Sequence, residues 1–310
     1  MFASSAGGRH AAPYSGSLAP PSVSNAEPWT ISRVIAWTAK DLAGRGIESS
    51  RLDAELLVAH ALGCKRLDLY LRFDQPLSDS ELARIRSLVE RRRKFEPVSY
   101  ILGVREFYGR PFAVDSRVLI PRPETEGVIE AAMELLPPRA EGVRPRVLDV
   151  GTGSGIIAVT LACERADLEV DAVELSPGAA EVARSNIARH NVSDRVTLFE
   201  GSLYRPVAGR QYSLIASNPP YIDTAEVDTL MPDVSKYEPR LALDGGPDGA
   251  TVLRPLIANA RAMLVEGGAL VVEIGYGQGD LVRELARAAG FTQVEVRPDL
   301  ARIERVLVAR

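Results

Sequence analysis

Two periodicities of hydrophobic residues divide the chain at about residue 124. Between residues 29 and 95, apolar residues recur every three or four positions, which predicts a small domain built of helices. The apolar face of its first helix carries Ile31, Val34, Ile35, Thr38 and Leu42. From residue 124 onward, short apolar runs alternate with helical stretches, which predicts an α/β domain with a mostly parallel sheet and helices on both faces.

The second helix of the small domain has its apolar positions at Leu52, Leu56 and Ala59 and ends at Gly63. A short apolar segment follows at 67–71.

A capping box formed by Ser78 and Glu81 predicts the start of the last helix of this domain. Its apolar stripe is Leu82, Ile85, Leu88 and Val89. The helix ends in the basic run 91–94, which we expect to be a solvated surface that complements the helix C-terminus. A patch that faces RNA or an acidic partner is the alternative, and 13 Lys and Arg against 9 Asp and Glu over residues 29–95 do not decide between them.

Residues 96–123 differ from both domains and are expected to join them. A turn at 108–111 separates two β-type runs, 98–107 and 112–120, which predicts a β-hairpin linker. The prolines of the stretch 120–123 predict a stiff, extended entry into the next helix.

The α/β domain is expected to contain five buried strands, at 146–150, 169–174, 196–200, 213–217 and 269–274. Helices are predicted between them at about 155–165, 177–190, 249–265 and 277–289. The segments 293–297 and 305–308 are expected to add a hairpin at one edge of the sheet. Because ligands of such sheets bind beyond the carboxyl ends of the strands, the chemistry should follow residues 150, 174, 200 and 217.

Composition limits the possible functions. The 310 residues are 46% hydrophobic and 25% charged, which excludes long-range disorder and a fibrous repeat. The net charge of −4 argues against binding of a polyanion by bulk electrostatics, and no stretch approaches the roughly 18 apolar residues of a membrane span. Two cysteines and three histidines do not favour a disulfide framework or a metal cage, so we expect no metal.

The first 28 residues are rich in Ala, Ser, Pro and Gly and are expected to be a disordered tail or the product of a misplaced start codon. They lack the basic start and apolar core of a secretory signal, so we expect a cytoplasmic protein.

A glycine-rich turn follows the first strand of the α/β domain and opens a helix. The sequence is Val147-Leu148-Asp149-Val150-Gly151-Thr152-Gly153-Ser154-Gly155. Glycines let the backbone approach a ligand, and the helix N-terminus offers N–H groups to a carboxylate. The spacing differs from the dinucleotide fingerprint, which needs glycine at Ile156, and from a P-loop. A tight turn without a ligand is the alternative.

Glu174 ends the next strand, about 20 residues beyond the glycine loop, where a carboxylate can accept both hydroxyls of a ribose. A solvated strand end is the alternative for Glu174 alone. Together, the loop and Glu174 predict a ligand that contains ribose and lacks pyrophosphate. S-adenosylmethionine fits, with its amino-acid end at the loop and its ribose at Glu174.

The sequence Asn218-Pro219-Pro220-Tyr221 follows a further strand. Its prolines stop the strand and stiffen the chain, so that Asn218 projects from a rigid corner. The Asn218 side-chain oxygen and the Pro219 carbonyl are placed to accept hydrogen bonds from one planar NH2 group, and Tyr221 is expected to stack on it. The arrangement suits a methyl acceptor that is an amide or exocyclic amine, held in line by proximity and orientation. An ordinary loop corner is the alternative.

The glycine loop with Asn218-Pro219-Pro220-Tyr221 resembles class I S-adenosylmethionine-dependent methyltransferases that act on planar nitrogen. These include DNA adenine-N6, ribosomal guanine-N2 and protein glutamine-N5 enzymes. Over residues 28–310 the chain resembles the last, the peptide chain release factor glutamine N5-methyltransferases (PrmC/HemK). The stretches that carry this resemblance are 51–57 (RLDAELL), 103–107 (GVREF), 120–126 (IPRPETE), 237–243 (YEPRLAL), 245–246 (GG) and 304–306 (ERV).

The resemblance implies a seven-stranded Rossmann-like methyltransferase domain at 124–310 and a substrate-recognition role for the helical domain. The substrate would be the glutamine of the Gly-Gly-Gln loop in class I peptide chain release factors, methylated on its amide nitrogen. Asn218, Pro219, Pro220 and Tyr221 would hold that glutamine. The cofactor S-adenosylmethionine would be surrounded by Asp149, Gly151, Thr152, Gly153, Ser154, Gly155, Glu174 and Asn218. We expect a monomer with no membrane and no direct nucleic-acid partner.

One stretch departs from the family pattern. The family often has Asp before an aromatic residue near the adenine, and this chain has Gly201-Ser202-Leu203-Tyr204. Ser202 can still form a hydrogen bond, and Leu203 can pack against adenine without an aromatic ring.

No general base stands out in the sequence. None is expected to be needed, because after methyl transfer the nitrogen carries a strongly acidic proton that can leave to water. Catalysis by positioning is therefore expected. The long connection 222–248 is expected to form a functional lid over the substrate. His60, His190, Cys64 and Cys163 lie within helical patterns and are expected to have no catalytic role.

Two other functions remain open from the sequence. One is a nucleic-acid amino-methyltransferase, which would use the same corner to hold a base. Such enzymes usually carry a recognition region and a basic surface, whereas the extra domain here is small and helical and the chain is net acidic. A non-catalytic binding module with an inherited fold is the other, and the intact asparagine of Asn218-Pro219-Pro220-Tyr221 argues against it.

Overall fold

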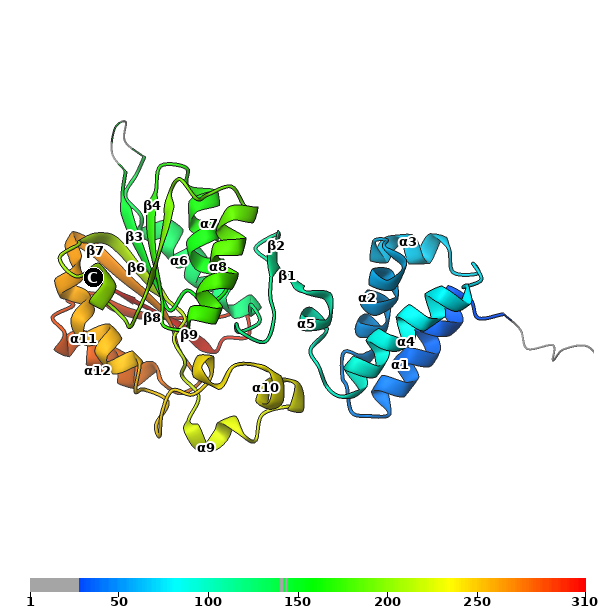
Figure 1. Ribbon diagram of the computed structural model, residues 1–310. Helices are drawn as coiled ribbons and strands as arrows, with labels where there is room; N and C mark the ends of the chain where they lie inside the picture. The colour runs from blue at the N-terminus through cyan, green and yellow to red at the C-terminus, as the bar shows by residue number, and fades with distance from the viewer. Residues whose placement is uncertain (1–27, 140–141, 143) are drawn as a thin grey trace, which may run out of the picture.

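The computed structural model describes residues 28–139, 142 and 144–310, and the tail expected at 1–28 lies outside them except for Pro28. A helical domain and a larger α/β domain lie side by side, and a short helix and a β-hairpin connect them (Figure 1). No helix in the described part of the chain is long and apolar enough to cross a membrane.

The helical domain contains four helices that bury one apolar cluster. They are α1 (Ile31–Ala43), α2 (Ser50–Leu62), α3 (Arg66–Leu71) and α4 (Asp79–Arg93). The predicted capping box is confirmed, because the Ser78 side chain accepts from the Glu81 N–H and the Glu81 carboxylate accepts from the Ser78 N–H. The cluster includes Ile35, Leu57, Leu69 and Ile85.

The predicted apolar face of α2 is wrong in part. Leu52 is 42% exposed, whereas Ala54, Leu57 and Val58 are completely buried. The reason is that α1, α3, α4 and α5 (Val98–Leu102) all contact α2, so more than one stripe of this helix is covered. The covered surface includes the carboxylate side chains of Asp53 and Glu55.

The expectation of a solvated basic run is wrong for Arg92. This side chain is buried, and its Nε donates to Asp53 Oδ2 at 2.8 Å. Its other end donates to Asp233 Oδ2 at 3.4 Å, in α10 (Pro232–Tyr237) of the α/β domain. Burial of Arg92 is tolerated because both ends of its guanidinium meet carboxylates.

The connection between the domains has shorter strands than predicted, and it contains a helix that was not predicted. Residues 98–102 form the helix α5 where a β-type run was expected. The hairpin consists of β1 (Val104–Phe107) and β2 (Arg110–Ala113), and its strand does not continue to residue 120. The turn is a two-residue one with positive φ at Tyr108 and Gly109, as hairpin twist favours.

The α/β domain is built on one seven-stranded sheet with the order β5-β4-β3-β6-β7-β9-β8. The strands are β3 (Arg146–Val150), β4 (Glu169–Glu174), β5 (Val196–Glu200), β6 (Tyr212–Ser217), β7 (Leu264–Glu273), β8 (Val294–Pro298) and β9 (Glu304–Ala309). The strands β3 to β7 run parallel to one another, and β9 lies antiparallel between β7 and β8. The predicted edge hairpin and the predicted mostly parallel sheet are both confirmed.

Helices cover both faces of this sheet, as predicted (Figure 1). One buried cluster contains residues of α6 (Glu126–Leu135), α7 (Ile156–Glu164) and α8 (Pro177–Arg189), together with Phe107 and Phe112 of the hairpin. The other contains residues of α11 (Leu253–Met263) and α12 (Gly279–Ala288). The hairpin therefore packs as part of the α/β domain.

The connection from β6 to α11 contains short helices. They are α9 (Thr224–Val227), α10 (Pro232–Tyr237) and the 3-10 turn Arg240–Ala242. Two further 3-10 turns, Pro123–Thr125 and Arg205–Val207, precede α6 and follow β5. The order β4-β3-β6 brings the carboxyl ends of these strands together at one edge of the sheet, where α9 and α10 also lie (Figure 1).

Candidate functional site

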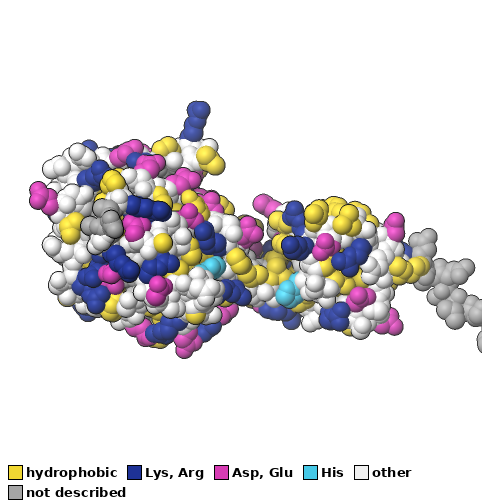
Figure 2. Space-filling model, turned by 90° about the horizontal axis from the view of Figure 1, so that it is seen from above, with side chains coloured by type: hydrophobic (Ala, Val, Ile, Leu, Met, Phe, Trp, Pro, Cys, Tyr) yellow, Lys and Arg dark blue, Asp and Glu magenta, His cyan; other side chains and the backbone are white. Residues whose placement is uncertain are grey.

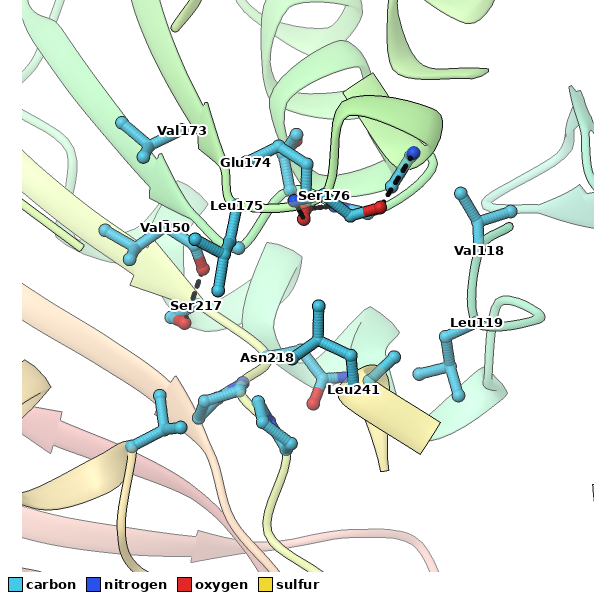
Figure 3. Close-up of a pocket in the computed structure, with 18 of the residues that line it drawn as sticks. Val118, Leu119, Val150, Val173, Glu174, Leu175, Ser176, Ser217, Asn218 and Leu241 are labelled. Atoms are coloured by element: carbon cyan, nitrogen blue, oxygen red, sulfur yellow. Dashed lines mark hydrogen bonds between the residues drawn. The ribbon is translucent and has the colours of Figure 1, made fainter. Parts of the chain in front are cut away.

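A pocket of about 400 Å³ opens at the carboxyl ends of β3, β4 and β6, where the sequence predicts the chemistry. This volume lies within the range of small-molecule sites. Of the expected site residues, Gly151, Thr152, Gly153, Ser154, Glu174, Ser202, Leu203, Asn218, Pro219 and Pro220 line it. Val118 and Leu119 face Val150 and Val173 across it (Figure 3).

The glycine loop is held in shape by its backbone conformation and by hydrogen bonds to β4. Gly151, Gly153 and Gly155 all have positive φ, at 72°, 57° and 85°. The N–H groups of Gly151 and Thr152 both donate to the Val173 carbonyl, at 2.8 and 3.0 Å. Glycine is required here by the backbone conformation, since an L side chain is strained at such φ values.

Asp149 supports this loop from behind and does not line the pocket. Its Oδ2 accepts from the Thr152 hydroxyl at 2.5 Å and from the Ala158 N–H at 3.1 Å. Within the described chain its Oδ1 has no hydrogen-bond partner. Complete burial raises the pKa of Asp149 to about 7, against the lowering effect of these two hydrogen bonds. Gly155 is likewise outside the lining, as the residue that caps α7.

Glu174 is held in a fixed position at the end of β4. Its Oε2 accepts from the Gly153 N–H and its Oε1 from the Ser176 N–H, both at 2.8 Å (Figure 3). Each oxygen keeps a lone pair for a further donor, so the carboxylate is able to receive two hydroxyl groups.

Apolar side chains flank Glu174. Leu175 is 52% exposed and lines the pocket beside it, as does Leu203. Leu203 has a positive φ of 49°, and a Cβ at Gly201 would lie 2.5 Å from Pro206. The segment 201–203 is therefore bent tightly enough to place Ser202 and Leu203 at the pocket wall.

Asn218 is oriented by a chain of buried hydrogen bonds. Its Nδ2 donates to the Thr125 hydroxyl at 3.0 Å, and that hydroxyl donates to Glu273 Oε2 at 2.6 Å. Thr125 and Glu273 are buried, at 0% and 1% exposed. Burial raises the pKa of Glu273, while the hydroxyls of Thr125 and Tyr221 favour its charged form.

The expectation that Tyr221 stacks on a bound amide stays a prediction, and the structure shows what holds the Tyr221 hydroxyl. Tyr221 does not line the pocket, and its hydroxyl donates to Glu273 Oε1 at 3.1 Å. Burial, followed by the charge of Glu273, raises the pKa of the Tyr221 phenol well above its usual value. Tyr221 thus supports Glu273 from the side opposite Thr125.

Close backbone packing fixes the corner that carries Tyr221. A Cβ at Gly249 would lie 2.4 Å from the Tyr221 carbonyl oxygen, and one at Gly245 would lie 2.8 Å from the Tyr221 Cα. Gln278 donates to the same Tyr221 oxygen at 3.3 Å. The glycines at 245 and 249 therefore allow the connection after β6 to fold directly against this corner.

The connection 222–248 is tied to the segment before α6. Glu238 Oε1 accepts from Arg122 at 2.5 Å, and its Oε2 accepts from the Ile120 N–H at 3.1 Å. Burial raises the pKa of Glu238 against the lowering effect of Arg122. The Tyr237 hydroxyl also donates to the Lys94 carbonyl of the helical domain. These bonds place Arg122, Pro239 and Leu241 on the pocket wall.

Sequence reasoning missed Thr125, Glu273, Leu175 and Leu241 as residues of the site. Glu273 ends an apolar strand at the same edge of the sheet as Glu174. The signal that singled out Glu174, an acid at the carboxyl end of a buried strand, therefore also applied to Glu273. In the described residues no group of three or more His, Cys, Asp or Glu side chains is arranged to hold a metal ion.

Family models match the helical domain and the first part of the α/β domain. A model described as the PrmC N-terminal domain matches residues 33–103, and one described as the methyltransferase small domain matches residues 128–234. A release factor glutamine methyltransferase of Geobacter sulfurreducens is 46% identical over 92% of this chain and 98% of its own. One of Rhodopirellula baltica is 40% identical over 92% of this chain and 97% of its own.

Solved structures share the fold. The hMettl16 catalytic domain in complex with a MAT2A 3′UTR hairpin has a TM-score of 0.53 and 16% identity, covering 75% of this chain and 82% of its own. At this identity the likeness concerns the arrangement of helices and strands alone.

Proposed function

The chain belongs to the family of release factor glutamine methyltransferases, and from this premise we propose how its pocket carries out the reaction. The protein methylates a glutamine of a peptide chain release factor with S-adenosylmethionine as methyl donor. The observation that carries the assignment of the acceptor site is that Asn218 lines the pocket with its NH2 group engaged by Thr125. Its side-chain oxygen is thereby left to receive a substrate N–H.

The pocket fits the cofactor by the chemistry of its lining. Glu174 would accept the two ribose hydroxyls, and the loop from Gly151 to Ser154 would surround the amino-acid end. Leu175 and Leu203 offer apolar surface to an adenine ring, with Ser202 beside them. Asp149 and Gly155 act from outside the pocket by holding the loop in shape. When bound, the cofactor supplies an electrophilic methyl group on sulfur.

Asn218 and Pro219 would hold the glutamine by two acceptors directed at its NH2 group. Their acceptor oxygens orient the nitrogen toward the methyl group, and Pro220 stiffens the corner. Proximity and orientation of this kind contribute up to roughly 7–11 kcal/mol to a barrier in favourable cases. We assign Tyr221 a supporting role through Glu273. The proton lost from nitrogen passes to water, and no general base is needed.

The finer identity of the substrate is the glutamine of a Gly-Gly-Gln loop in a class I release factor, methylated on its amide nitrogen. The helical domain at 29–95 is proposed to recognise the rest of the release factor. Its face around α3 carries exposed apolar side chains, and Figure 2 shows hydrophobic side chains gathered on this domain. We infer a monomer that works in the cytoplasm without a nucleic-acid partner.

Replacement of Asn218 tests the acceptor site. Asn218→Ala should remove most turnover of the release factor and leave S-adenosylmethionine binding within about twofold of wild type, because the cofactor contacts lie mainly on β3 and β4. Turnover is measured by methyl transfer, and cofactor binding by calorimetry on the same preparations. Wild-type turnover in this variant would remove Asn218 from the mechanism.

A further inference from the structure

With Glu273 ionised, as the hydroxyls of Thr125 and Tyr221 favour, the buried hydrogen-bond chain behind Asn218 has only one consistent direction. Glu273 as a carboxylate has acceptor oxygens and no donor. Both hydroxyls that contact it, those of Thr125 and Tyr221, must therefore donate to it, at 2.6 and 3.1 Å. Each hydroxyl has one hydrogen, so Thr125 has none left for Asn218.

This direction determines which way the Asn218 amide points. Toward Asn218, the Thr125 oxygen is able only to accept, and it does so from Nδ2 at 3.0 Å. A reversed amide would place two oxygen acceptors against each other without a hydrogen between them. The carboxamide is planar, so fixing Nδ2 on Thr125 turns the side-chain oxygen away from Thr125. The oxygen is thereby directed toward the pocket, which Asn218 lines.

The orientation matters because the two amide orientations select different substrates. With its oxygen toward the pocket, Asn218 accepts from a glutamine NH2 group. With its own NH2 group toward the pocket, Asn218 would place a donor against the glutamine NH2 donor. It would then favour a carboxylate, such as that of glutamate. An unpaired buried polar group is costly, so a fixed orientation of Asn218 is selective.

We propose that Thr125 and Glu273 are positioning residues that lock the Asn218 carboxamide with its oxygen toward the substrate, and so determine selection of glutamine over glutamate. The proposal rests on the proposed function of Asn218 and adds the source of its specificity. Thr125 lies 93 residues before Asn218 and Glu273 lies 55 after it, in separate elements that the sheet brings together. Tyr221 completes the set by occupying the second oxygen of Glu273.

Two variants of Thr125 separate this role from packing. Thr125→Val keeps the shape and removes the hydroxyl, whereas Thr125→Ser keeps the hydroxyl and removes a methyl group. If the hydroxyl relay matters, the Ser variant retains most of the kcat and the Val variant loses at least about tenfold. If Thr125 only fills space at its completely buried position, the order is reversed.

The specific readout is discrimination between two release factors, the natural one and a version whose Gly-Gly-Gln glutamine is replaced by glutamate. Their binding is compared by calorimetry on protein loaded with S-adenosylhomocysteine, which has no methyl group to transfer. Wild type and Thr125→Ser should prefer glutamine, and Thr125→Val should lose about tenfold or more of that preference. Thermal unfolding and S-adenosylmethionine affinity are measured on every variant. The affinity should stay close to wild type, whereas Thr125→Val should unfold at a lower temperature, because it leaves buried polar groups of Asn218 and Glu273 unpaired.

If Thr125→Val does not fold, Glu273→Gln carries the test. Its side-chain amide is able either to accept from Thr125 or to donate to it, so the direction of the relay is lost and the preference for glutamine should fall. An unchanged preference in a folded Thr125→Val or Glu273→Gln protein would overturn the proposal while leaving the proposed function intact. A wild-type protein without any preference would overturn the proposal and also the proposed role of Asn218 in holding the glutamine.

Discussion

The guanidinium of Arg92 in the helical domain lies 3.4 Å from the carboxylate of Asp233 in the connection that borders the pocket. The same guanidinium is anchored by Asp53 at 2.8 Å. Together with the bond from Tyr237 to the Lys94 carbonyl, this contact connects the proposed recognition domain to the segment that carries Glu238 and Pro239. The two domains are therefore joined at the edge of the proposed active site as well as through the hairpin.

Removing Asp53 is expected to destabilise the helical domain strongly. Asp53→Leu leaves the charge of Arg92 buried with only its longer contacts to Asp233 and to the Glu96 carbonyl, which should cost about 3–5 kcal/mol in the free energy of unfolding. Adding Arg92→Met removes the buried charge and should restore most of that loss. Urea unfolding of both variants measures the difference.

An exposed ion pair in α4, the helix that carries Arg92, provides the control. Glu90 is 51% exposed and pairs with Arg93, so Glu90→Gln should change the free energy of unfolding by less than about 1 kcal/mol. A double variant no more stable than Asp53→Leu alone would contradict the account of Arg92 as a buried, compensated charge.

The exposed apolar face of α3 is expected to contribute to release factor binding. Leu67 and Leu71 are 71% and 80% exposed, and neither serves the core. The double change Leu67→Ser and Leu71→Ser should raise the KM for an intact release factor severalfold and leave the KM for a short Gly-Gly-Gln peptide unchanged. Steady-state methyl transfer with the two substrates measures this.

Leu300→Ser is the matched control, because Leu300 is fully exposed in the α/β domain between β8 and β9. It should change neither KM. Equal effects of the α3 changes on intact protein and peptide would remove the recognition role of this face.

Asp149 is expected to make stability depend on pH. Folding raises its pKa from about 3.9 in an unfolded chain to about 7, so between these values the folded protein binds more protons than the unfolded one. Its contribution therefore favours the folded state at low pH and weakens as the pH rises through this window. Asp149→Asn keeps an acceptor for Thr152 and Ala158 and removes the titration.

The test compares the free energies of unfolding of wild type and Asp149→Asn between about pH 5 and 8. Wild type should lose stability relative to the variant as the pH rises, by on the order of a few kcal/mol across the window. A difference between the two proteins that is constant with pH would show that Asp149 does not titrate there.

The sheet was predictable because its strands are short apolar runs bounded by turns. The predicted bounds of β3, β4 and β5 agree with the structure, since each is set by local sequence. Apart from Ser99, residues 98–102 are β-branched, aromatic or aliphatic, a pattern that also suits a strand, and only the structure shows that they form α5. Local periodicity could not separate the two at this length.

The residues that orient the site were harder to predict for a different reason. Arg92 looks solvated in a run of four basic residues, and its burial depends on Asp53 and Asp233, 39 and 141 residues away. The contact between Asn218 and Thr125 likewise spans 93 residues. Spacing along the chain identified the glycine loop and Asn218, which act close to their own strands, but not the partners that arrive from other elements.

The most direct measurement offers the purified protein S-adenosylmethionine labelled on its methyl group, with four acceptors in parallel. These are an unmethylated class I release factor, the same factor with alanine in place of the Gly-Gly-Gln glutamine, duplex DNA and ribosomal RNA. The account predicts label on the first acceptor alone. Label on the alanine version would place the reaction at another residue, and label on nucleic acid would mean that Asn218 holds a base.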